Sequence, residues 1–178
     1  MKFSEAPLAG AYVIDLDRVA DERGFFARSF CETEFAARGL PPPLRQSSVS
    51  FNAKRGTLRG LHFQAAPDEE EKLVRCTAGA IFDVIVDLRP ASATHRRWFA
   101  AELSAVNHRS LYVPKGFAHG FMSLTDSSEV LYMISAPFVA SAARGVRWDD
   151  PAIGIEWPMA PTVMCARDAG YPLLRDGA

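Results

Sequence analysis

The sequence predicts an all-β protein of the jelly-roll type, in which two sheets form a β-sandwich or barrel and the helices are short and peripheral. Runs rich in valine, isoleucine and phenylalanine recur at intervals of about 8 to 15 residues, with turn residues between them. No helical pattern separates these runs, which argues against parallel βαβ units. The chain has 178 residues, 48% of them apolar, which is room for one core. We therefore predict a single domain over residues 1–178.

The strand runs share β-branched or aromatic residues and end at turn residues. In chain order they are Tyr12 to Leu16, Phe25 to Phe30, Leu58 to Phe63, Leu73 to Thr77, Ile81 to Leu88, Trp98 to Leu103, Leu111 to Val113, Gly120 to Leu124 and Val130 to Ile134. In the run from Ile81, a period of two places Phe82 and Val84 on one face and Asp83 and Asp87 on the other. We expect the first face to pack on a core and the second to tolerate charge.

One segment, Thr33 to Arg38, has residues typical of the start and end of a helix at its two ends. Thr33 is a suitable N-cap, and Gly39 followed by three prolines stops the helix after one or two turns. Pro137 to Pro161 and the tail behind it are richer in proline, glycine and tryptophan than the strands. We expect them to cover the barrel.

Composition excludes several classes of protein. The formal net charge of -1 provides no field that would attract nucleic acid or an anionic membrane. Three cysteines without paired short spacing suggest neither a disulfide framework nor a zinc site. The first residues lack the order of a signal peptide, and no apolar run approaches the roughly 20 residues that cross a bilayer. We predict a cytoplasmic protein that binds neither nucleic acid nor membranes.

Two of the four histidines stand in unusual surroundings. No phosphate-binding glycine motif and no Gly-x-Ser-x-Gly occurs, so the chemistry must come from other residues. His95 and His108 lie among polar and basic residues, where we expect a solvated surface. His62 lies in a strand that also carries Arg59 and Gln64, and His119 follows a Pro-Lys-Gly turn.

Strict alternation would put Arg59 and His62 on opposite faces of their strand. A bulge at Gly60 adds one residue and would turn both side chains toward the same interior. An interior that holds charged groups needs partners or a ligand, because an unpaired buried charge is costly. The alternative interpretation of His62 is a hydrogen-bonded histidine with only a structural role.

Metal binding and acid–base catalysis compete as explanations. Barrels of this kind often bind a metal through His-x-His, a carboxylate and a later histidine, but Gln64 takes the second position here. The run Asp68 to Glu71 follows Pro67 and is expected to be a solvated loop. A histidine oriented by a carboxylate can instead remove a proton next to a carbonyl, a tyrosine can return it, and a cation can hold the enolate. Residues able to supply the other parts are Lys72, Arg59, Tyr132 and Asp168.

Six motifs in this order resemble the dTDP-4-dehydrorhamnose 3,5-epimerase family. They are Asp21 to Phe26, Arg59 to Gln64, Lys72 to Val74, Gly79 to Arg89, Gly116 to Phe121, and Asp149 to Pro158. The resemblance covers nearly the whole chain. It implies a cupin-type jelly roll, a homodimer, no metal and no organic cofactor. It also implies a nucleotide-diphosphate 4-keto-6-deoxy sugar as the substrate.

The resemblance also implies roles for single residues. It places the catalytic base at His62, the aspartate that pairs with the base at Asp168, and the acid at Tyr132. The remaining implied contacts are Lys72 and Arg59 near the keto oxygen and the diphosphate, Arg23, Gln46 and His119 elsewhere on the ligand, and Phe26, which reaches the nucleotide from the partner subunit. The C4 ketone acidifies the hydrogens on C3 and C5, so one base can serve both centres.

Three residues depart from the pattern of the family. Arg28 stands where thymidine-binding members usually have a glutamate, Ser48 replaces an asparagine, and Phe138 replaces a tyrosine near the sugar. Arginine only donates hydrogen bonds and glutamate only accepts them, so the same base edge is not read in the same way. Alternatively, Arg28 turns to solvent and Gln46 and Phe26 still hold thymidine.

We therefore expect a cofactor-independent epimerase of deoxysugar or surface-glycan biosynthesis that acts at C3, C5 or both. The nucleotide base stays open among dTDP, CDP, GDP and UDP. The alternatives are an epimerase for one centre on a non-thymidine sugar nucleotide, a binding protein without catalytic activity, and a metal-dependent cupin enzyme.

Overall fold

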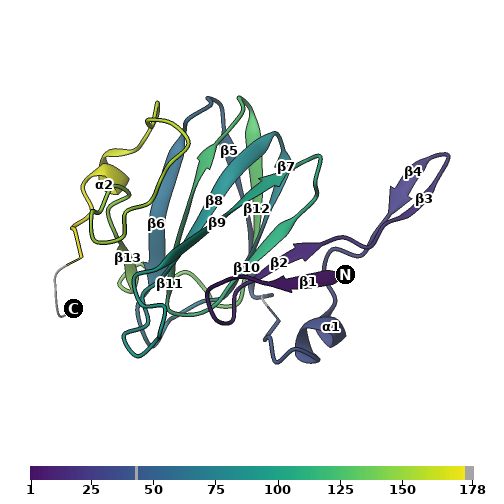
Figure 1. The fold of residues 1–178 in the computed structure, drawn as a ribbon, viewed down its shortest axis with the longest axis horizontal. Coiled ribbons are helices and arrows are strands. Elements are labelled where there is room, and N and C mark those ends of the chain that lie inside the picture. Colours follow the sequence, from purple (N-terminus) through teal and green to yellow (C-terminus); the bar gives the residue numbers. More distant parts are fainter. Residues whose placement is uncertain (43, 175–178) are drawn as a thin grey trace.

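The computed structural model describes residues 1–42 and 44–174, which form two facing β-sheets with a hairpin that projects from one end (Figure 1). One sheet has six strands in the order β1-β2-β10-β7-β12-β5, and the other has five in the order β13-β6-β11-β8-β9. Neighbouring strands in both sheets are antiparallel. This is the predicted cupin-type jelly roll.

The strands of the six-stranded sheet are β1 (Lys2–Glu5), β2 (Tyr12–Asp15), β5 (Gln46–Asn52), β7 (Lys72–Ala78), β10 (Ser110–Val113) and β12 (Ser128–Ile134). Those of the five-stranded sheet are β6 (Leu58–Gln64), β8 (Ala80–Asp87), β9 (Trp98–Ser104), β11 (Phe117–Ser123) and β13 (Ala143–Gly145). The hairpin consists of β3 (Val19–Asp21) and β4 (Gly24–Phe26), and the helices are α1 (Glu32–Ala36) and α2 (Ala166–Ala169).

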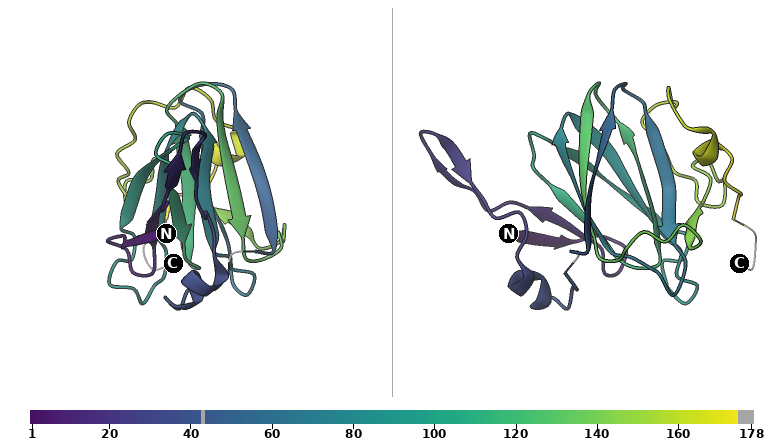
Figure 2. Two further views of the ribbon diagram at one scale, coloured as in Figure 1. Left: turned by 90° about the vertical axis from the view of Figure 1, so that its right-hand side faces the viewer. Right: turned by 180° about the vertical axis from the view of Figure 1, so that it is seen from behind.

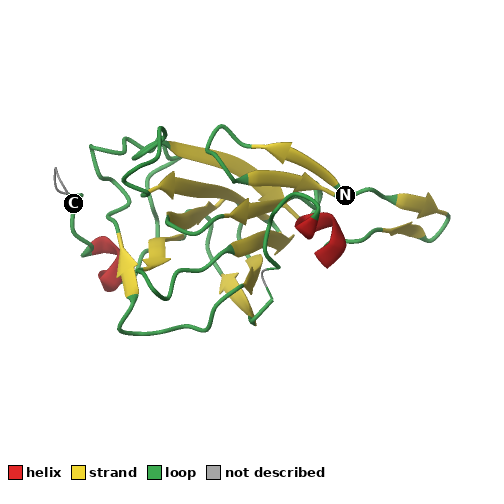
Figure 3. Ribbon diagram, turned by 90° about the horizontal axis from the view of Figure 1, so that it is seen from below, coloured by secondary structure: helices red, strands yellow, loops and turns green. Residues whose placement is uncertain are grey.

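The main core fills part of the space between the two sheets. Val74 and Val130 of the six-stranded sheet pack there against Ile85 and Phe121 of the five-stranded sheet. A second cluster lies where α1 contributes its buried Phe35. Figure 2 shows the two sheets edge-on and from behind, and Figure 3 shows the hairpin and α2 at opposite ends of the molecule.

The face of β8 that was expected to tolerate charge carries two carboxylates, and it is not exposed to solvent. Asp83 and Asp87 are both fully buried, because both faces of this strand are covered. Each carboxylate has a partner inside the protein: Asp83 accepts a hydrogen bond from His119, and Asp87 pairs with Arg89. The polar face of β8 is therefore an interior face.

The short elements differ in detail from their predictions. The helix begins at Glu32 with Cys31 as N-cap, two residues before the predicted cap Thr33. The strand predicted from Phe25 to Phe30 ends at Phe26. The structure adds strands β1, β3, β5 and β13, of which β5 (Gln46–Asn52) escaped prediction because alternate residues face a polar pocket and not an apolar core. Within residues 1–42 and 44–174, no helix has the length and hydropathy to cross a bilayer.

The predicted bulge in β6 is confirmed. His62 lies opposite His119 of β11 and Arg59 lies opposite Phe121, so β6 takes three steps where β11 takes two. Gly60 has φ +130°, and a Cβ built on it would lie 2.6 Å from the Cα of Gly120. Both Arg59 and His62 line the same pocket as a result.

Replacing Gly60 by alanine tests this close approach of β6 and β11. Gly60→Ala should lower the free energy of unfolding by about 3 kcal/mol, because backbone strain at positive φ adds to a clash with backbone atoms. Gly24→Ala is the matched control, since Gly24 has φ +124° with nothing within 4 Å of its Cβ position. Urea denaturation measures both. Equal losses in the two variants would contradict a steric role for Gly60.

Candidate active site

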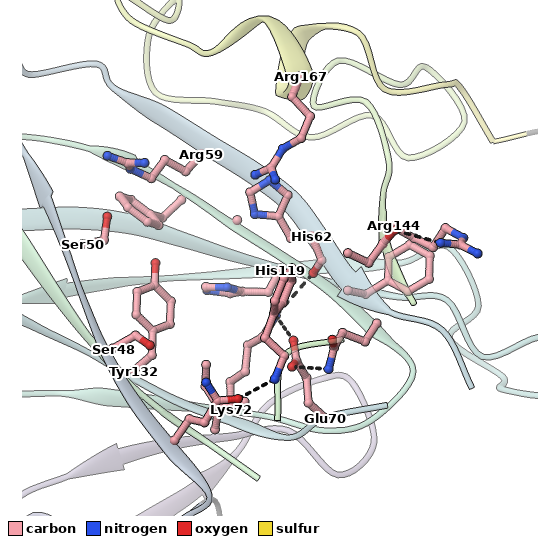
Figure 4. A pocket seen from close by; sticks show the side chains of 18 of the residues that line it. Ser48, Ser50, Arg59, His62, Glu70, Lys72, His119, Tyr132, Arg144 and Arg167 are labelled. Atoms are coloured by element: carbon pink, nitrogen blue, oxygen red, sulfur yellow. Dashed lines mark hydrogen bonds and ion pairs between the residues drawn. The ribbon is translucent and has the colours of Figure 1, made fainter. Parts of the chain in front are cut away.

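A pocket of about 360 Å³ opens between the two sheets, and residues of both sheets line it (Figure 4). Eight side chains singled out from the sequence lie on its wall: Gln46, Ser48, Arg59, His62, Lys72, His119, Tyr132 and Phe138. The strands β5, β7 and β12 supply one wall, and β6 and β11 supply the other. The fold thus collects in one place residues that are far apart in the chain.

His62 is paired with a buried carboxylate. Its Nε2 lies 2.8 Å from Oδ1 of Asp168, which is 1% exposed, and Oδ2 of Asp168 accepts a hydrogen bond from the backbone N–H of Gly60 at 3.0 Å. Burial by itself raises the pKa of Asp168, but the hydrogen bonds from His62 and Gly60 outweigh it and hold the pKa well below its ordinary value. The ionised carboxylate keeps the proton on Nε2, which leaves Nδ1 of His62 free to accept one.

The C-terminal tail brings Asp168 to this position. Val163 forms a parallel bridge with Thr57, just before β6 begins. Farther along, the N–H of Leu174 donates to Asp150 at 2.5 Å. Between these two anchors, α2 lies beside β6 and directs Asp168 at the strand (Figure 1).

Tyr132 enters the pocket from the opposite sheet. Its ring packs edge-on against His119, with ring centroids 5.9 Å apart, and its hydroxyl points into the pocket (Figure 4). Burial raises the pKa of Tyr132, and the nearby carboxylate of Asp83 raises it further. The phenol therefore keeps its proton at neutral pH.

A second imidazole–carboxylate pair lies next to the first. His119 Nε2 is 2.8 Å from Oδ1 of Asp83, and both side chains are buried. His119 and His62 are direct partners across β6 and β11. The two rings thus occupy neighbouring positions on one wall of the pocket.

Several cations line the pocket. Arg59 is held by Asn52, whose Oδ1 accepts from Nε at 2.8 Å, and Lys72 donates to the backbone oxygen of His62 at 3.4 Å. Arg144 and Arg167 also lie on the wall. Such a set of donors is suited to a diphosphate or to the oxygen of an enolate.

The acidic run before β7 is not the solvated loop that the sequence suggested. Glu71 is buried, and Glu70 lines the pocket and pairs with Lys72 at 3.0 Å. Among the described residues no group of three or more histidine, cysteine or acidic side chains could hold a metal ion. The amide of Gln64 instead binds Glu70 and backbone groups.

Five polar residues of the pocket wall were not identified from the sequence: Ser50, Glu70, Arg144, Arg167 and Tyr171. Ser50 continues the alternation of Gln46 and Ser48 along β5, and this period was a usable signal. Glu70 lies two residues before Lys72 in the sequence. Nothing local in the sequence distinguishes Arg144, Arg167 or Tyr171 from surface residues.

Three of the predicted ligand contacts lie outside this pocket. Arg23 and Phe26 belong to the projecting hairpin, where Phe26 is 78% exposed. Arg28 follows the hairpin and pairs with Glu34 at 3.3 Å. Met1, Asp17, Val19, Phe26, Ala27, Arg28 and Glu34 line a smaller hollow there.

The two histidines expected on the surface are half-buried. His95 bonds the backbone oxygen of Arg89 through Nδ1 at 3.1 Å. His108 packs against Phe25 at the base of the hairpin, and burial together with Arg18 and Arg75 lowers its pKa. Neither ring lines the pocket.

A profile of the family described as dTDP-4-dehydrorhamnose 3,5-epimerase matches residues 5–176. The chain belongs to this family. A dTDP-4-dehydrorhamnose 3,5-epimerase of Sinorhizobium fredii is 45% identical over 175 residues, which cover 98% of this chain and 90% of that protein.

Solved structures of family members have the same fold. The dTDP-4-dehydrorhamnose 3,5-epimerase from Bacillus anthracis, with TDP and PPi bound, matches with a TM-score of 0.93 at 40% identity, covering 97% of this chain and 99% of that one. A 3′-monoepimerase from Streptomyces bikiniensis in complex with dTDP-quinovose matches with a TM-score of 0.87 at 31% identity, covering 94% and 85%. Proteins with this fold thus include one named as a 3,5-epimerase and one named as a 3′-monoepimerase.

The lowered pKa of Asp168 makes a prediction about stability and pH. In the folded protein the carboxyl of Asp168 stays ionised at pH values below its ordinary pKa of about 4. The pair of Asp168 and His62 therefore stabilises the fold fully above pH 4, and this stabilisation is lost as the pH falls toward the pKa that Asp168 has in the folded protein. We expect Asp168→Asn to lower the free energy of unfolding by about 1 to 3 kcal/mol at pH 7. The difference from wild type should begin to shrink below about pH 4.

Urea denaturation at a series of pH values measures this difference. Asp17→Asn, at an exposed residue, is the control and should leave stability at pH 7 unchanged. A wild-type advantage over Asp168→Asn that grows as pH falls below 4 would contradict the assigned direction of the pKa shift.

Proposed function

We propose that this protein epimerises a nucleotide-diphosphate 4-keto-6-deoxy sugar at C3, at C5 or at both, in deoxysugar or surface-glycan biosynthesis. The observation that carries the proposal is the pair His62 and Asp168 on one wall of the pocket with Tyr132 on the other. Such an enzyme is an isomerase. The named activities of its relatives support the same reaction class.

The reaction begins with proton transfer to His62. The C4 ketone acidifies the hydrogen on the neighbouring carbon, Nδ1 of His62 takes that proton, and the electron pair of the C–H bond moves into an enolate. Lys72 and Arg59 supply positive charge for the enolate oxygen. Asp168 stabilises the imidazolium that forms.

Reprotonation from the other wall inverts the centre. Tyr132 donates its hydroxyl proton to the same carbon from the opposite face of the sugar, which restores the ketone and leaves a phenolate. The imidazolium and the phenolate then return to their starting states by proton exchange with solvent. Electrons and atoms balance without an oxidant, so the step fits a cofactor-independent enzyme.

The remaining cations suit the diphosphate of the substrate. Arg144 and Arg167 lie on the wall of the same pocket as Arg59. One guanidinium group can donate two parallel hydrogen bonds to phosphate oxygens, which favours arginine at such sites. His119, Gln46, Ser48 and Phe138 line the remaining wall and are proposed as further contacts of the substrate.

The names of the relatives favour thymidine as the nucleoside. The Sinorhizobium fredii relative is a dTDP-4-dehydrorhamnose 3,5-epimerase, and the Bacillus anthracis structure holds TDP. Arg28 differs from the glutamate expected for thymidine, and its side chain is exposed and paired with Glu34. This supports the alternative in which Arg28 turns aside and thymidine is bound through other residues. The Streptomyces bikiniensis 3′-monoepimerase supports inversion of one centre as the second candidate.

A homodimer explains the residues that stand outside the pocket. Phe26 and Val19 are exposed on a hairpin that projects from the sheets, which is costly in water unless a partner covers them. We propose that Arg23 and Phe26 reach the nucleotide in the pocket of a second copy, while Arg28 stays paired with Glu34. A single domain over residues 1–178 and a cytoplasmic location stay predictions.

Isotope exchange tests the proposed reaction. In heavy water, the enzyme should place deuterium at C3, C5 or both of a 4-keto-6-deoxy sugar nucleotide. NMR measures this incorporation. His62→Ala should abolish exchange. Tyr132→Phe should retain some exchange but lose inversion by about 10²- to 10⁴-fold, because the enolate still forms without its acid.

A panel of dTDP, CDP, GDP and UDP 4-keto sugars serves as the substrate set for the same assay. His95→Ala, outside the pocket, is the control and should exchange like wild type. Tight binding of a sugar nucleotide without any exchange would favour the binding protein over the enzyme. Unchanged exchange in His62→Ala would remove His62 as the base.

Subunit complementation tests the hairpin. His62→Ala and Phe26→Ala should each lose activity alone, but a mixed dimer has one site with an intact His62 and an intact partner Phe26. Random mixing after reversible dissociation should restore about a quarter of wild-type activity, because half of the dimers are mixed and each has one intact site. Activity equal to the average of the two separate variants would contradict a shared site.

A further inference from the structure

Glu70 is a carboxylate in a pocket whose lining also includes three arginines and a lysine. Its side chain is 12% exposed, and it is the single acidic residue on the pocket wall within the described part of the chain. Oε1 lies 3.0 Å from Nζ of Lys72, and Oε2 accepts a hydrogen bond from Nε2 of Gln64 at 2.9 Å. Both of its oxygens are therefore engaged by pocket residues (Figure 4).

Gln64 holds this carboxylate in place. The amide is buried at the end of β6, and its Oε1 accepts from the backbone N–H of Val139 at 2.6 Å. Its Nε2 also donates to the backbone oxygens of Asp68 and Pro137. Because Gln64 ties the loop before β7 to the segment after β12, Glu70 has a fixed position and is not a mobile surface acid.

The side chain of Lys72 is flexible, so a hydrogen bond to the substrate in one fixed direction requires that its ammonium group be held in place. Its side chain has four rotatable carbon bonds and ends in three equivalent donors. One donor meets Glu70 and a second meets the backbone oxygen of His62 at 3.4 Å. With two hydrogens directed in this way, the tetrahedral ammonium group has one N–H left for a ligand.

We propose that Glu70 is a positioning residue for Lys72, and that it aims the remaining N–H of Lys72 at the C4 oxygen of the substrate. This inference rests on the proposed function, because it assigns Lys72 to the enolate. Glu70 does not contact the reacting atoms. It acts through the ammonium group, whose hydrogen bond to the C4 oxygen strengthens as negative charge develops there.

The role predicts which kinetic constant changes. An interaction that strengthens only as the enolate forms contributes to kcat, whereas an interaction made equally with bound substrate contributes to KM. A displacement of about 1 Å at a catalytic group can cost on the order of 10²-fold in rate. Loss of Glu70 should therefore lower kcat much more than it raises KM.

Two variants of Glu70 and one neighbour test the proposal. Glu70→Ala should lower kcat by about 10- to 100-fold with KM within about threefold of wild type. Glu70→Gln keeps an acceptor for Lys72 but loses the negative charge, so it should recover part of the loss and keep a kcat below that of wild type. Glu69→Ala, next in the same acidic run but outside the pocket wall, is the matched control and should behave like wild type.

A double-mutant cycle separates positioning from a general structural effect. If Glu70 acts through Lys72, Glu70→Ala should change the deuterium exchange rate by less than about twofold in a Lys72→Ala background. An equal loss in both backgrounds, or a wild-type kcat in Glu70→Ala, overturns the proposal. Should Glu70→Ala fail to fold, as judged by its thermal transition, the kcat of Glu70→Gln decides: a wild-type KM with a lowered kcat supports positioning, and an unchanged kcat overturns it.

Failure of the proposed function looks different in this experiment. Wild-type protein that exchanges no deuterium with any 4-keto sugar nucleotide contradicts the epimerase, whatever Glu70 does. Wild-type protein that exchanges while Glu70→Ala matches it contradicts only the role of Glu70.

Discussion

The hydrogen bond between Asp168 and His62 is the interaction on which the site depends. It joins a carboxylate of the C-terminal tail to a strand 106 residues earlier in the chain. Burying a carboxylate is unfavourable, and here the N–H groups of His62 and Gly60 offset that cost. The orientation of the imidazole therefore depends on the position of the tail, which the bridge between Thr57 and Val163 anchors beside β6.

A second constraint acts on the strand that carries the histidine. The bulge at Gly60 turns Arg59 and His62 to the same side and lets β6 approach Gly120 of β11 more closely than a side chain would permit. The opposite sheet supplies Tyr132 and Lys72. The proposed base therefore lies on one sheet and the proposed acid on the other, which is the arrangement that inversion of a carbon centre requires.

The regular elements were predictable because runs of β-branched and aromatic residues, separated by turn residues, are typical of strands that pack on an apolar core. That logic failed where the interior is a polar pocket. Asp83 and Glu70 resemble solvated residues in the sequence, yet both are inside and paired. The serines of β5 conceal a strand for the same reason. Burial among partners and exposure to water select the same residue types, so local patterns do not separate them.

The sequence by itself determined the two-sheet architecture, the bulge at Gly60 and, through its motifs, the family and eight of the residues that line the pocket. The alternation of side chains along a strand and the residue types of turns are properties of short segments. They can be recognised in the sequence without knowing which segments pack together. Only the tertiary structure decided that Glu70 meets Lys72, that Arg144 and Tyr171 join the pocket wall, and that Phe26 stands outside it. These outcomes depend on how two sheets and a tail pack together, and packing distances are not encoded in any single stretch of sequence.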